Sequence, residues 1–189
     1  NKILDINMGC PVNKIIKNGC GADLMLNHKL AFKIVKNIVD SVSVPVSVKI
    51  RSGWDQNKKN AVDFARVLEE AGASFITIHG RTRNQFYSGN VDLDIIKAVK
   101  NSVKIPVIGN GDISFPQDAK KMFEYTSCDG VMVGRGIYGK PWLLYHIIYF
   151  LKTGIILPSL SVLEIKEILL KHLIKIFEYY GDKVGIFLS

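Results

Sequence analysis

The chain has 189 residues, of which 48% are hydrophobic and 22% charged, and its formal net charge is +8. This length suits one globular domain with part of a second, and the composition is that of a folded protein rather than a disordered one. The longest apolar run, at 141–151, is about half of the roughly 20 residues that cross a bilayer, so it predicts a docked helix instead. No signal peptide is expected, because the first residues already have the pattern of a strand.

The positive charge has two explanations that composition does not separate. One is a lysine-rich composition throughout the chain, and the other is a polyanionic partner such as nucleic acid. The three cysteines, Cys10, Cys20 and Cys128, cannot all pair with one another and lack the spacing of a zinc site. The sequence therefore predicts free thiols, a cytoplasmic location and no metal site.

Short apolar runs alternate with amphipathic stretches along most of the chain. We predict strands within 2–8, 44–51, 74–80, 105–111 and 129–135, and helices over 28–40, 58–71, 92–101 and 115–125. The runs are rich in Val and Ile and continuous, which is typical of parallel strands covered by helices. Five such units suit either an open doubly wound α/β sheet or part of a TIM (β/α)8 barrel.

The polar residues near the strand ends favour the barrel. Asn7, Lys49, His79 and Asn110 lie at or near the carboxyl ends of four predicted strands. In a barrel these ends converge on one face, where active sites form. The last two strands run into the glycine-rich turns GNGDIS and GRGIYGKP before helices, and the loops after the seventh and eighth barrel strands usually bind phosphate.

If these are the last two strands, the chain holds only the C-terminal five strand–helix units of a barrel. We therefore interpret it as an internal segment of a longer protein. Residues 1–150 would form the C-terminal part of the barrel. Residues 151–189 would be the truncated start of a helical domain, because apolar residues recur there with a helical period from Leu163 to Ile176.

Cys10 is the first candidate for chemistry. A free cysteine is most often a buried packing residue. Here Asn7 precedes it and Pro11 ends the strand, so the thiol would project toward the mouth of a barrel. With an ordinary pKa of about 8.5 it would be protonated at neutral pH and could donate a proton as well as attack. Cys20, between glycines, and Cys128 are expected to be structural.

Lys49 and His79 are candidates for binding a ligand. A lysine on the inward face of a parallel array needs an anionic or polar partner, such as a phosphate or the polar edge of a flavin ring. His79 is either a core histidine or a ligand contact, and the Gly80-Arg81 pair that follows favours the contact. No Ser-His-Asp pattern, paired carboxylates or HExxH occurs, which disfavours hydrolysis. The residues alone indicate a phosphate-bearing cofactor, one thiol and a basic surface.

Five blocks of the sequence closely resemble the tRNA-dihydrouridine synthases, and most closely the bacterial B-type branch. They are DINMGCPVNKIIKNGCGADLML, VKIRSGWD, ITIHGRTRNQFYSG, IPVIGNGDI and DGVMVGRGIYGKPWLL, and they cover nearly the whole chain in order. The resemblance implies a flavin-bearing TIM barrel followed by a small helical domain that helps to hold tRNA. It also implies a monomer that uses NADPH, or NADH, to reduce a D-loop uridine of tRNA to 5,6-dihydrouridine.

The resemblance also implies roles for individual residues. Cys10 would be the catalytic acid that protonates C5 of the uracil ring, after reduced FMN passes hydride to C6. The residues implied in binding FMN are Lys49, His79, Asn110, Gly111, Asp112, Gly134 and Arg135. Those implied in binding the substrate are Asn7, Lys14, Arg51, Arg81 and Arg83. The target base would be swung out of its stack, and a basic surface would bind the tRNA backbone.

The chain departs from the family pattern at both ends. The early flavin contacts of the family would precede residue 1 and the helical domain is cut short, so we expect residues 1–189 alone to be poorly active and poorly stable. Two alternatives remain open. One is a flavin barrel like dihydroorotate or dihydropyrimidine dehydrogenase, although those usually read SCP where this chain has MGCPVNK. The other is a non-catalytic RNA-binding barrel.

Overall fold

The structure is a computed structural model that describes residues 2–188, with side chains described through residue 182. The chain divides into two compact units, residues 1–154 and residues 155–189, and each is described by itself. The first unit ends at Gly154, a few residues past the boundary at residue 150 expected from the sequence. It therefore contains the whole of helix α6 (Leu143–Thr153). Within the described residues, no helix is both long and apolar enough to span a membrane.

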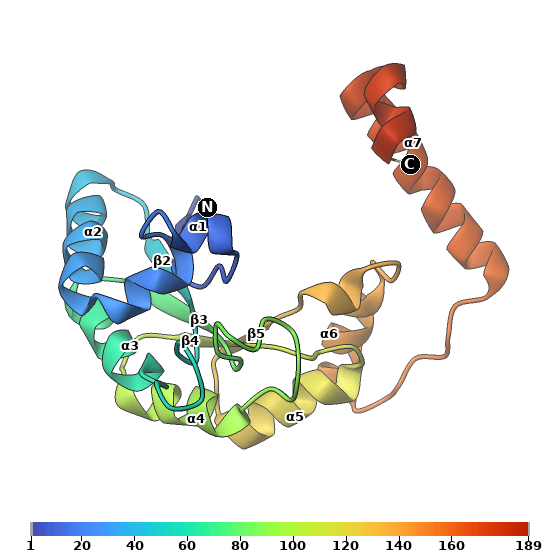
Figure 1. The fold of residues 1–189 in the computed structure, drawn as a ribbon. Coiled ribbons are helices and arrows are strands. Elements are labelled where there is room, and N and C mark those ends of the chain that lie inside the picture. The colour runs from blue at the N-terminus through green and yellow to red at the C-terminus, as the bar shows by residue number, and fades with distance from the viewer. Residues whose placement is uncertain (1, 189) are drawn as a thin grey trace. The chain divides into compact units, whose positions relative to one another are not determined.

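The first unit is a five-stranded parallel sheet in which each strand is followed by helical structure (Figure 1). The strands are β1 (Leu4–Asn7), β2 (Val46–Arg51), β3 (Phe75–His79), β4 (Val107–Asn110) and β5 (Gly130–Met132). The helices are α1 (Asn13–Ile16), η1 (Gly21–Leu26), α2 (His28–Ser41), α3 (Ala61–Glu70), α4 (Leu93–Ser102), α5 (Pro116–Thr126), η2 (Arg135–Ile137) and α6. Every strand and helix predicted in this unit is present.

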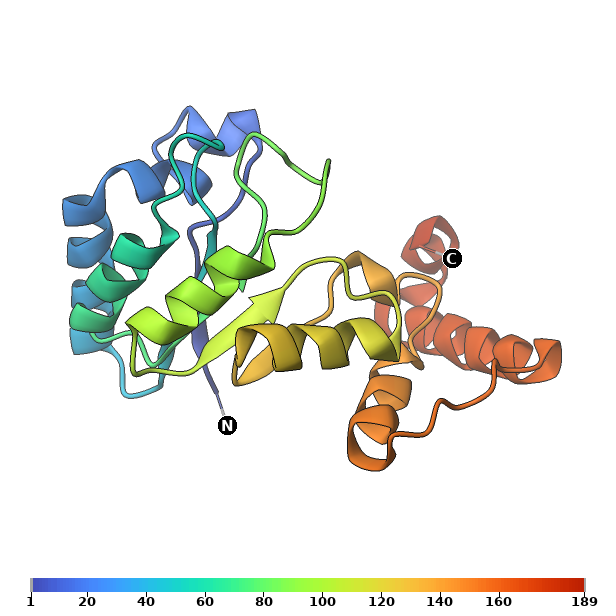
Figure 2. The same ribbon diagram turned by 90° about the horizontal axis from the view of Figure 1, so that it is seen from below.

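The order of the strands identifies the architecture. It follows the chain, β1-β2-β3-β4-β5, and all four pairings are parallel. A doubly wound sheet reverses its strand order and carries helices on both faces. Here α2 packs on α3, α3 on α4, α4 on α5 and α5 on α6, so the helices cover one face of a curved, open sheet (Figures 1 and 2). This is the arrangement of consecutive units of a TIM barrel, as the sequence predicted.

The apolar faces of the helices explain how this layer forms. Asn27 caps α2 by accepting a hydrogen bond from the Leu30 N–H at 3.1 Å, and Asp92 caps α4 in the same way through Ile95. The core lies between sheet and helices. Its fully buried side chains include Val35, Val48, Ile50, Phe64, Leu68, Ile76, Ile78, Ile96 and Val99.

The opposite face of the sheet is polar. Strand register places Asn7 beside Lys49 and Lys49 beside Thr77, and one level further along it places Arg51 beside His79 and His79 beside Asn110. Polar side chains from four strands therefore meet at the carboxyl edge of the sheet.

The second unit contains α7 (Val162–Leu188), the helical tail that the sequence predicted. Ser161 and Glu164 form a capping box at its start, because the Ser161 N–H donates to the Glu164 carboxylate at 2.8 Å and the Glu164 N–H donates to the Ser161 hydroxyl at 3.3 Å. The helix is interrupted at Gly181, whose φ of 74° is not helical.

Candidate active site at the carboxyl ends of the strands

A cavity of about 470 Å³ opens at the carboxyl edge of the sheet. All of the site residues predicted from the sequence line it except Lys14 and Arg83. Each strand, or the loop that follows it, contributes to the wall. The arrangement matches the expectation that the ends of parallel strands converge on one functional face.

Cys10 is held at one side of this cavity by a compact turn. The Asn7 side-chain oxygen accepts hydrogen bonds from the N–H groups of Gly9 and Cys10, both at 3.0 Å. The Cys10 carbonyl accepts from the Ala22 N–H at 3.0 Å, which fixes the other side of the residue. Because the oxygen of Asn7 serves the turn, its NH₂ group is the end that can contact a ligand. The thiol is free and half-buried.

Burial and positive charge act together on the basic side chains of the cavity. Burial, followed by repulsion from Arg51, lowers the pKa of Lys49 to about 8. Burial, together with repulsion from Arg51, Lys49 and Arg81, lowers the pKa of His79 to about 3. His79 is therefore a neutral imidazole at physiological pH. Lys49 is a cation that loses its proton in the mildly alkaline range.

Arg51 is buried and bonded within the protein. Its Nε donates to the Gly9 carbonyl at 2.9 Å, and its Nη1 donates to the carbonyls of Thr82 and Phe86 at 2.8 and 2.9 Å. Burial lowers its pKa, and the neighbouring Tyr87 opposes that shift. The guanidinium lines the cavity wall while joining the Cys10 turn to the loop after β3.

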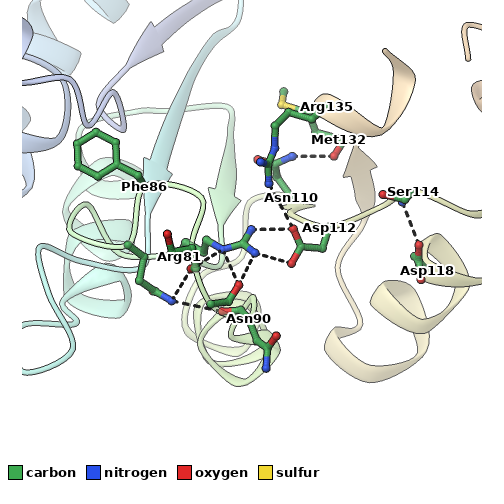
Figure 3. Close-up of polar contacts among 12 residues, drawn as sticks. Arg81, Phe86, Asn90, Asn110, Asp112, Ser114, Asp118, Met132 and Arg135 are labelled. Carbon is green, nitrogen blue, oxygen red and sulfur yellow. Dashed lines mark hydrogen bonds and ion pairs between the residues drawn. The ribbon is translucent and has the colours of Figure 1, made fainter. Parts of the chain in front are cut away.

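Arg81 is also buried, against the loop after β4. Its guanidinium forms a two-pronged ion pair with Asp112, with both N–O distances at 2.7 Å, and donates to the carbonyls of Ser88 and Gly89 (Figure 3). The more exposed Arg135 approaches the same carboxylate at 3.8 Å. Arg135 therefore keeps donors that are available to an anion, whereas Arg81 is engaged within the protein.

Glycines bring the loops after β4 and β5 into close contact. A Cβ on Gly136 would lie 2.1 Å from the Ile113 carbonyl oxygen, so these two loops touch there. A Cβ on Gly111, whose φ is +133°, would lie 2.5 Å from the Val91 side chain, in the segment that follows β3. Asn110 donates to the Met132 carbonyl at 2.8 Å and so ties the two strand ends together (Figure 3). Glycine-rich loops packed this closely before helices are typical of phosphate sites.

Lys14 and Arg83 lie outside the cavity lining. Lys14 is exposed on the short helix α1. Arg83 is half-buried, donates to the side-chain oxygens of Asn13 and Asn84, and stacks over Trp54 with its guanidinium carbon 4.8 Å from the ring centroid.

Sequence reasoning missed several residues of the wall, of which Tyr87 is the most prominent. Its ring lies 4.3 Å from the Arg135 guanidinium carbon and 5.9 Å from that of Arg51, and its centroid is 6.5 Å from that of His79. The adjacent aromatic pair in the polar stretch NQFYSG was the available signal. The further lining residues not predicted are Gly9, Pro11, Ile113, Ser114, Met132, Gly136 and Tyr138.

Comparison with protein families and curated sequences gives a consistent result. Residues 1–188 match the family model described as dihydrouridine synthase (Dus). The chain is 49% identical over 185 residues to a probable tRNA-dihydrouridine synthase of Rickettsia typhi, covering 98% of this chain and 57% of that protein. It is 43% identical over 184 residues to tRNA-dihydrouridine synthase B of Shewanella oneidensis, covering 97% and 57%. The chain thus spans somewhat more than half the length of these relatives.

Similarity to solved structures is weaker. A putative phosphonomutase from Burkholderia cenocepacia aligns over 69% of this chain and 68% of its own, with a TM-score of 0.48 and 16% identity. A FabK mutant from Thermotoga maritima covers 71% and 35%, with a TM-score of 0.44 and 19% identity. The strand order and the helix packing identify the architecture.

Proposed function

Because the chain belongs to the dihydrouridine synthase family, we propose that the protein containing it reduces a D-loop uridine of cytoplasmic tRNA to 5,6-dihydrouridine. The reaction would use FMN as cofactor and NADPH as reductant. The observation that carries this proposal is the position of Cys10, a half-buried thiol whose turn is held by Asn7 beside a cationic, glycine-lined cavity. Flavin ring and target base would share that cavity.

The residues present fit FMN. The glycine cradle of the β4 and β5 loops, with Arg135 on its rim, suits a phosphate dianion. Lys49 and neutral His79 lie on the sheet side, where a cationic donor and a neutral ring can contact the polar edge and the face of a flavin. A bound, reduced flavin supplies the hydride for C6 of the uracil ring.

The chain's own residues then complete the reaction. Cys10 gives its proton to C5, the thiol S–H bond breaks, and a thiolate remains that recovers a proton from solvent. The buried Arg51 guanidinium lies in the same wall and favours that transient negative charge. The NH₂ group of Asn7 can donate to a carbonyl oxygen of the base and so fix C5 near the sulfur.

The neutral state of His79 is consistent with this role. A second full positive charge beside Lys49 would be costly in so buried a position, and burial with its cationic neighbours keeps the pKa of His79 low. A neutral imidazole can donate one hydrogen bond and accept another. It can therefore orient a cofactor without competing with Cys10 for the proton.

The proposal is tested with full-length protein, NADPH and tRNA made by transcription, which carries no modified bases. Mass spectrometry of the digested tRNA should show a gain of about two daltons in one uridine, as the addition of two hydrogen atoms requires. Cys10→Ala should abolish the gain. Cys20→Ala should retain it, because that thiol lies outside the cavity. Reduction of free pyrimidine bases without reduction of tRNA would refute the proposal and favour the dehydrogenase-like alternative.

A further inference from the structure

Arg83 and Arg51 bind the chain on opposite sides of Cys10. Arg51 donates to the carbonyl of Gly9, the residue before Cys10. Arg83 donates to the side chain of Asn13, three residues after it. Both arginines connect the Cys10 segment to one loop, because Arg51 also donates to Thr82 and Phe86 while Arg83 belongs to that loop itself.

The loop after β3, which contains Arg83 and accepts the bonds from Arg51, is held to its neighbours by backbone hydrogen bonds. Its backbone bonds to the loop after β2, with the Arg83 N–H donating to Gly53 at 2.8 Å and the Asn84 N–H donating to Trp54 at 3.0 Å. Gly53 is required there, since a Cβ would lie 2.2 Å from the Lys58 carbonyl oxygen. The support behind Arg83 is therefore rigid backbone rather than a mobile side chain.

The side chain of Arg83 is pre-positioned by aromatic rings. Its guanidinium carbon is 4.8 Å from the centroid of Trp54 and 5.6 Å from that of Phe86, and its buried Nε has no hydrogen-bond partner among the described residues. Phe86 has a φ of +50°, a conformation that non-glycine residues rarely adopt. This backbone conformation accompanies the bond from Arg51 to the Phe86 carbonyl. The guanidinium is stacked on rings, and its two terminal nitrogens donate to Asn84 and Asn13. Such a side chain is better suited to holding a protein segment in place than to adapting to a flexible RNA strand.

We propose that Arg83 is a positioning residue for the Cys10 thiol, acting through Asn13, rather than a direct contact of the substrate. This inference rests on the proposed reaction, in which Cys10 is the proton donor. The loop between β3 and α4 would be a clamp that fixes both ends of the Cys10 segment, with Arg51 on the Gly9 side and Arg83 on the Asn13 side.

A positioning residue and a phosphate contact differ in the substitutions that they tolerate. A phosphate contact needs only positive charge, so Arg83→Lys would keep it. A positioning clamp needs the planar, ring-stacked fork, so Arg83→Lys should fail nearly as fully as Arg83→Ala. Asn13→Ala removes no charge and should reproduce the defect, and the double variant should be no worse than either single variant.

The test measures single-turnover formation of dihydrouridine by the reduced full-length holoenzyme, together with tRNA affinity. In Arg83→Ala, Arg83→Lys and Asn13→Ala we expect rates about 10- to 100-fold lower, because a displacement of about 1 Å at a reacting group has effects of this size. Flavin content and the Kd for tRNA should be unchanged. Arg66→Ala, at an exposed arginine on α3, is the matched control and should behave as wild type.

A second readout does not depend on the reaction. Alkylation of Cys10 by iodoacetamide should be at least about threefold faster in Arg83→Ala and Asn13→Ala, because a released segment exposes the half-buried thiol. If the wild-type protein formed no dihydrouridine but Cys10 alkylation were faster in both Arg83→Ala and Asn13→Ala, the clamp would be supported and the proposed function would be refuted. Unchanged alkylation, or a raised Kd for tRNA that Arg83→Lys restores, would overturn the clamp.

Discussion

Three arginines, Arg51, Arg81 and Arg83, lie in or beside the wall of the cavity, and each has different bonding partners. Arg51 bonds three backbone carbonyls, Arg81 forms a two-pronged ion pair with Asp112, and Arg83 stacks on Trp54. The family resemblance implied substrate contacts for all three, two of them in HGRTR and one at a strand end. The bonding partners of these arginines lie mostly far away in the sequence, so local sequence patterns do not predict them.

Lys49 should limit the stability of the flavin-free protein. Since burial lowers its pKa to about 8, the folded state holds a charge that the fold disfavours. We expect Lys49→Met to raise the free energy of unfolding at pH 7 by about 1 kcal/mol while impairing flavin binding. Denaturant unfolding of the full-length apoprotein measures this.

The stabilisation by Lys49→Met should depend on pH, and the pKa shift of Lys49 determines the direction. In unfolded protein the lysine pKa is near 10.4, so from pH 8 to about pH 10 the unfolded wild type holds more protons than the folded form. Wild-type stability therefore rises with pH over this range, and the advantage of Lys49→Met shrinks. Lys36→Met, on the exposed face of α2, should show no such trend. An advantage that grows above pH 8 would contradict this account.

Arg81 should contribute strongly to folding. Arg81→Ala removes the two-pronged partner of the Asp112 carboxylate, leaving it the more distant Arg135, and removes the guanidinium that donates to the Ser88 and Gly89 carbonyls. We therefore expect a loss of about 2–4 kcal/mol in the free energy of unfolding. Arg81→Lys should recover little of this, because it cannot form the two-pronged pair. The exposed pair between Arg66 and Asp63 provides the contrast, and Arg66→Ala should change stability by less than about 0.5 kcal/mol. Equal effects at both positions would refute the structural role of Arg81.

At the scale of elements, the sequence predicted nearly the whole barrel segment. Continuous Val and Ile runs located β1 to β5, and amphipathic spacing located α2 to α5, because burial against one sheet face imposes those periods. Some boundaries differ by a few residues, as at α3, which begins at Ala61 rather than near residue 58. The loop from Arg81 to Asn90 was not predictable, since its shape depends on bonds to the end of β2 and to the segments after β1, β2 and β4.

The glycine cradle makes an element-level prediction. Gly136→Ala would push a methyl group against the Ile113 carbonyl oxygen, 2.1 Å away, and so separate the β4 and β5 loops. We expect the affinity for FMN to fall at least about tenfold, as for a binding group displaced by about 1 Å. Gly139→Ala is the contrasting control. Among the described residues nothing lies within 4 Å of its new Cβ, and its φ of +68° adds backbone strain that Gly136 lacks, so retained flavin there assigns the Gly136 effect to the steric clash. Flavin absorbance after dialysis measures both variants, and equal retention would contradict the cradle.

At the scale of the whole molecule, the net charge of +8 would favour binding of the tRNA phosphates if the substrate is tRNA. Each phosphate neutralised by a lysine or arginine releases counterions, so binding should weaken steeply with salt. We expect the Kd of the full-length protein for tRNA to rise at least about tenfold between 50 and 200 mM salt. Lys14→Ala should reduce the slope of log Kd against log salt by about 0.7–1, whereas Lys36→Ala, paired with Asp40, should leave it unchanged. A salt-independent Kd would exclude a backbone-binding role for the basic surface.

The most direct test of the account is a single turnover in which the reduced holoenzyme is mixed anaerobically with unmodified tRNA, and flavin oxidation and dihydrouridine are followed together. For wild type, we predict one dihydrouridine for each flavin oxidised. For Cys10→Ala, whose cavity keeps Asn7 and Lys49 but lacks the thiol, we predict at least about a hundredfold slower product formation with unchanged tRNA affinity. Dihydrouridine formed by Cys10→Ala at the wild-type rate would contradict the assignment of Cys10 as the proton donor.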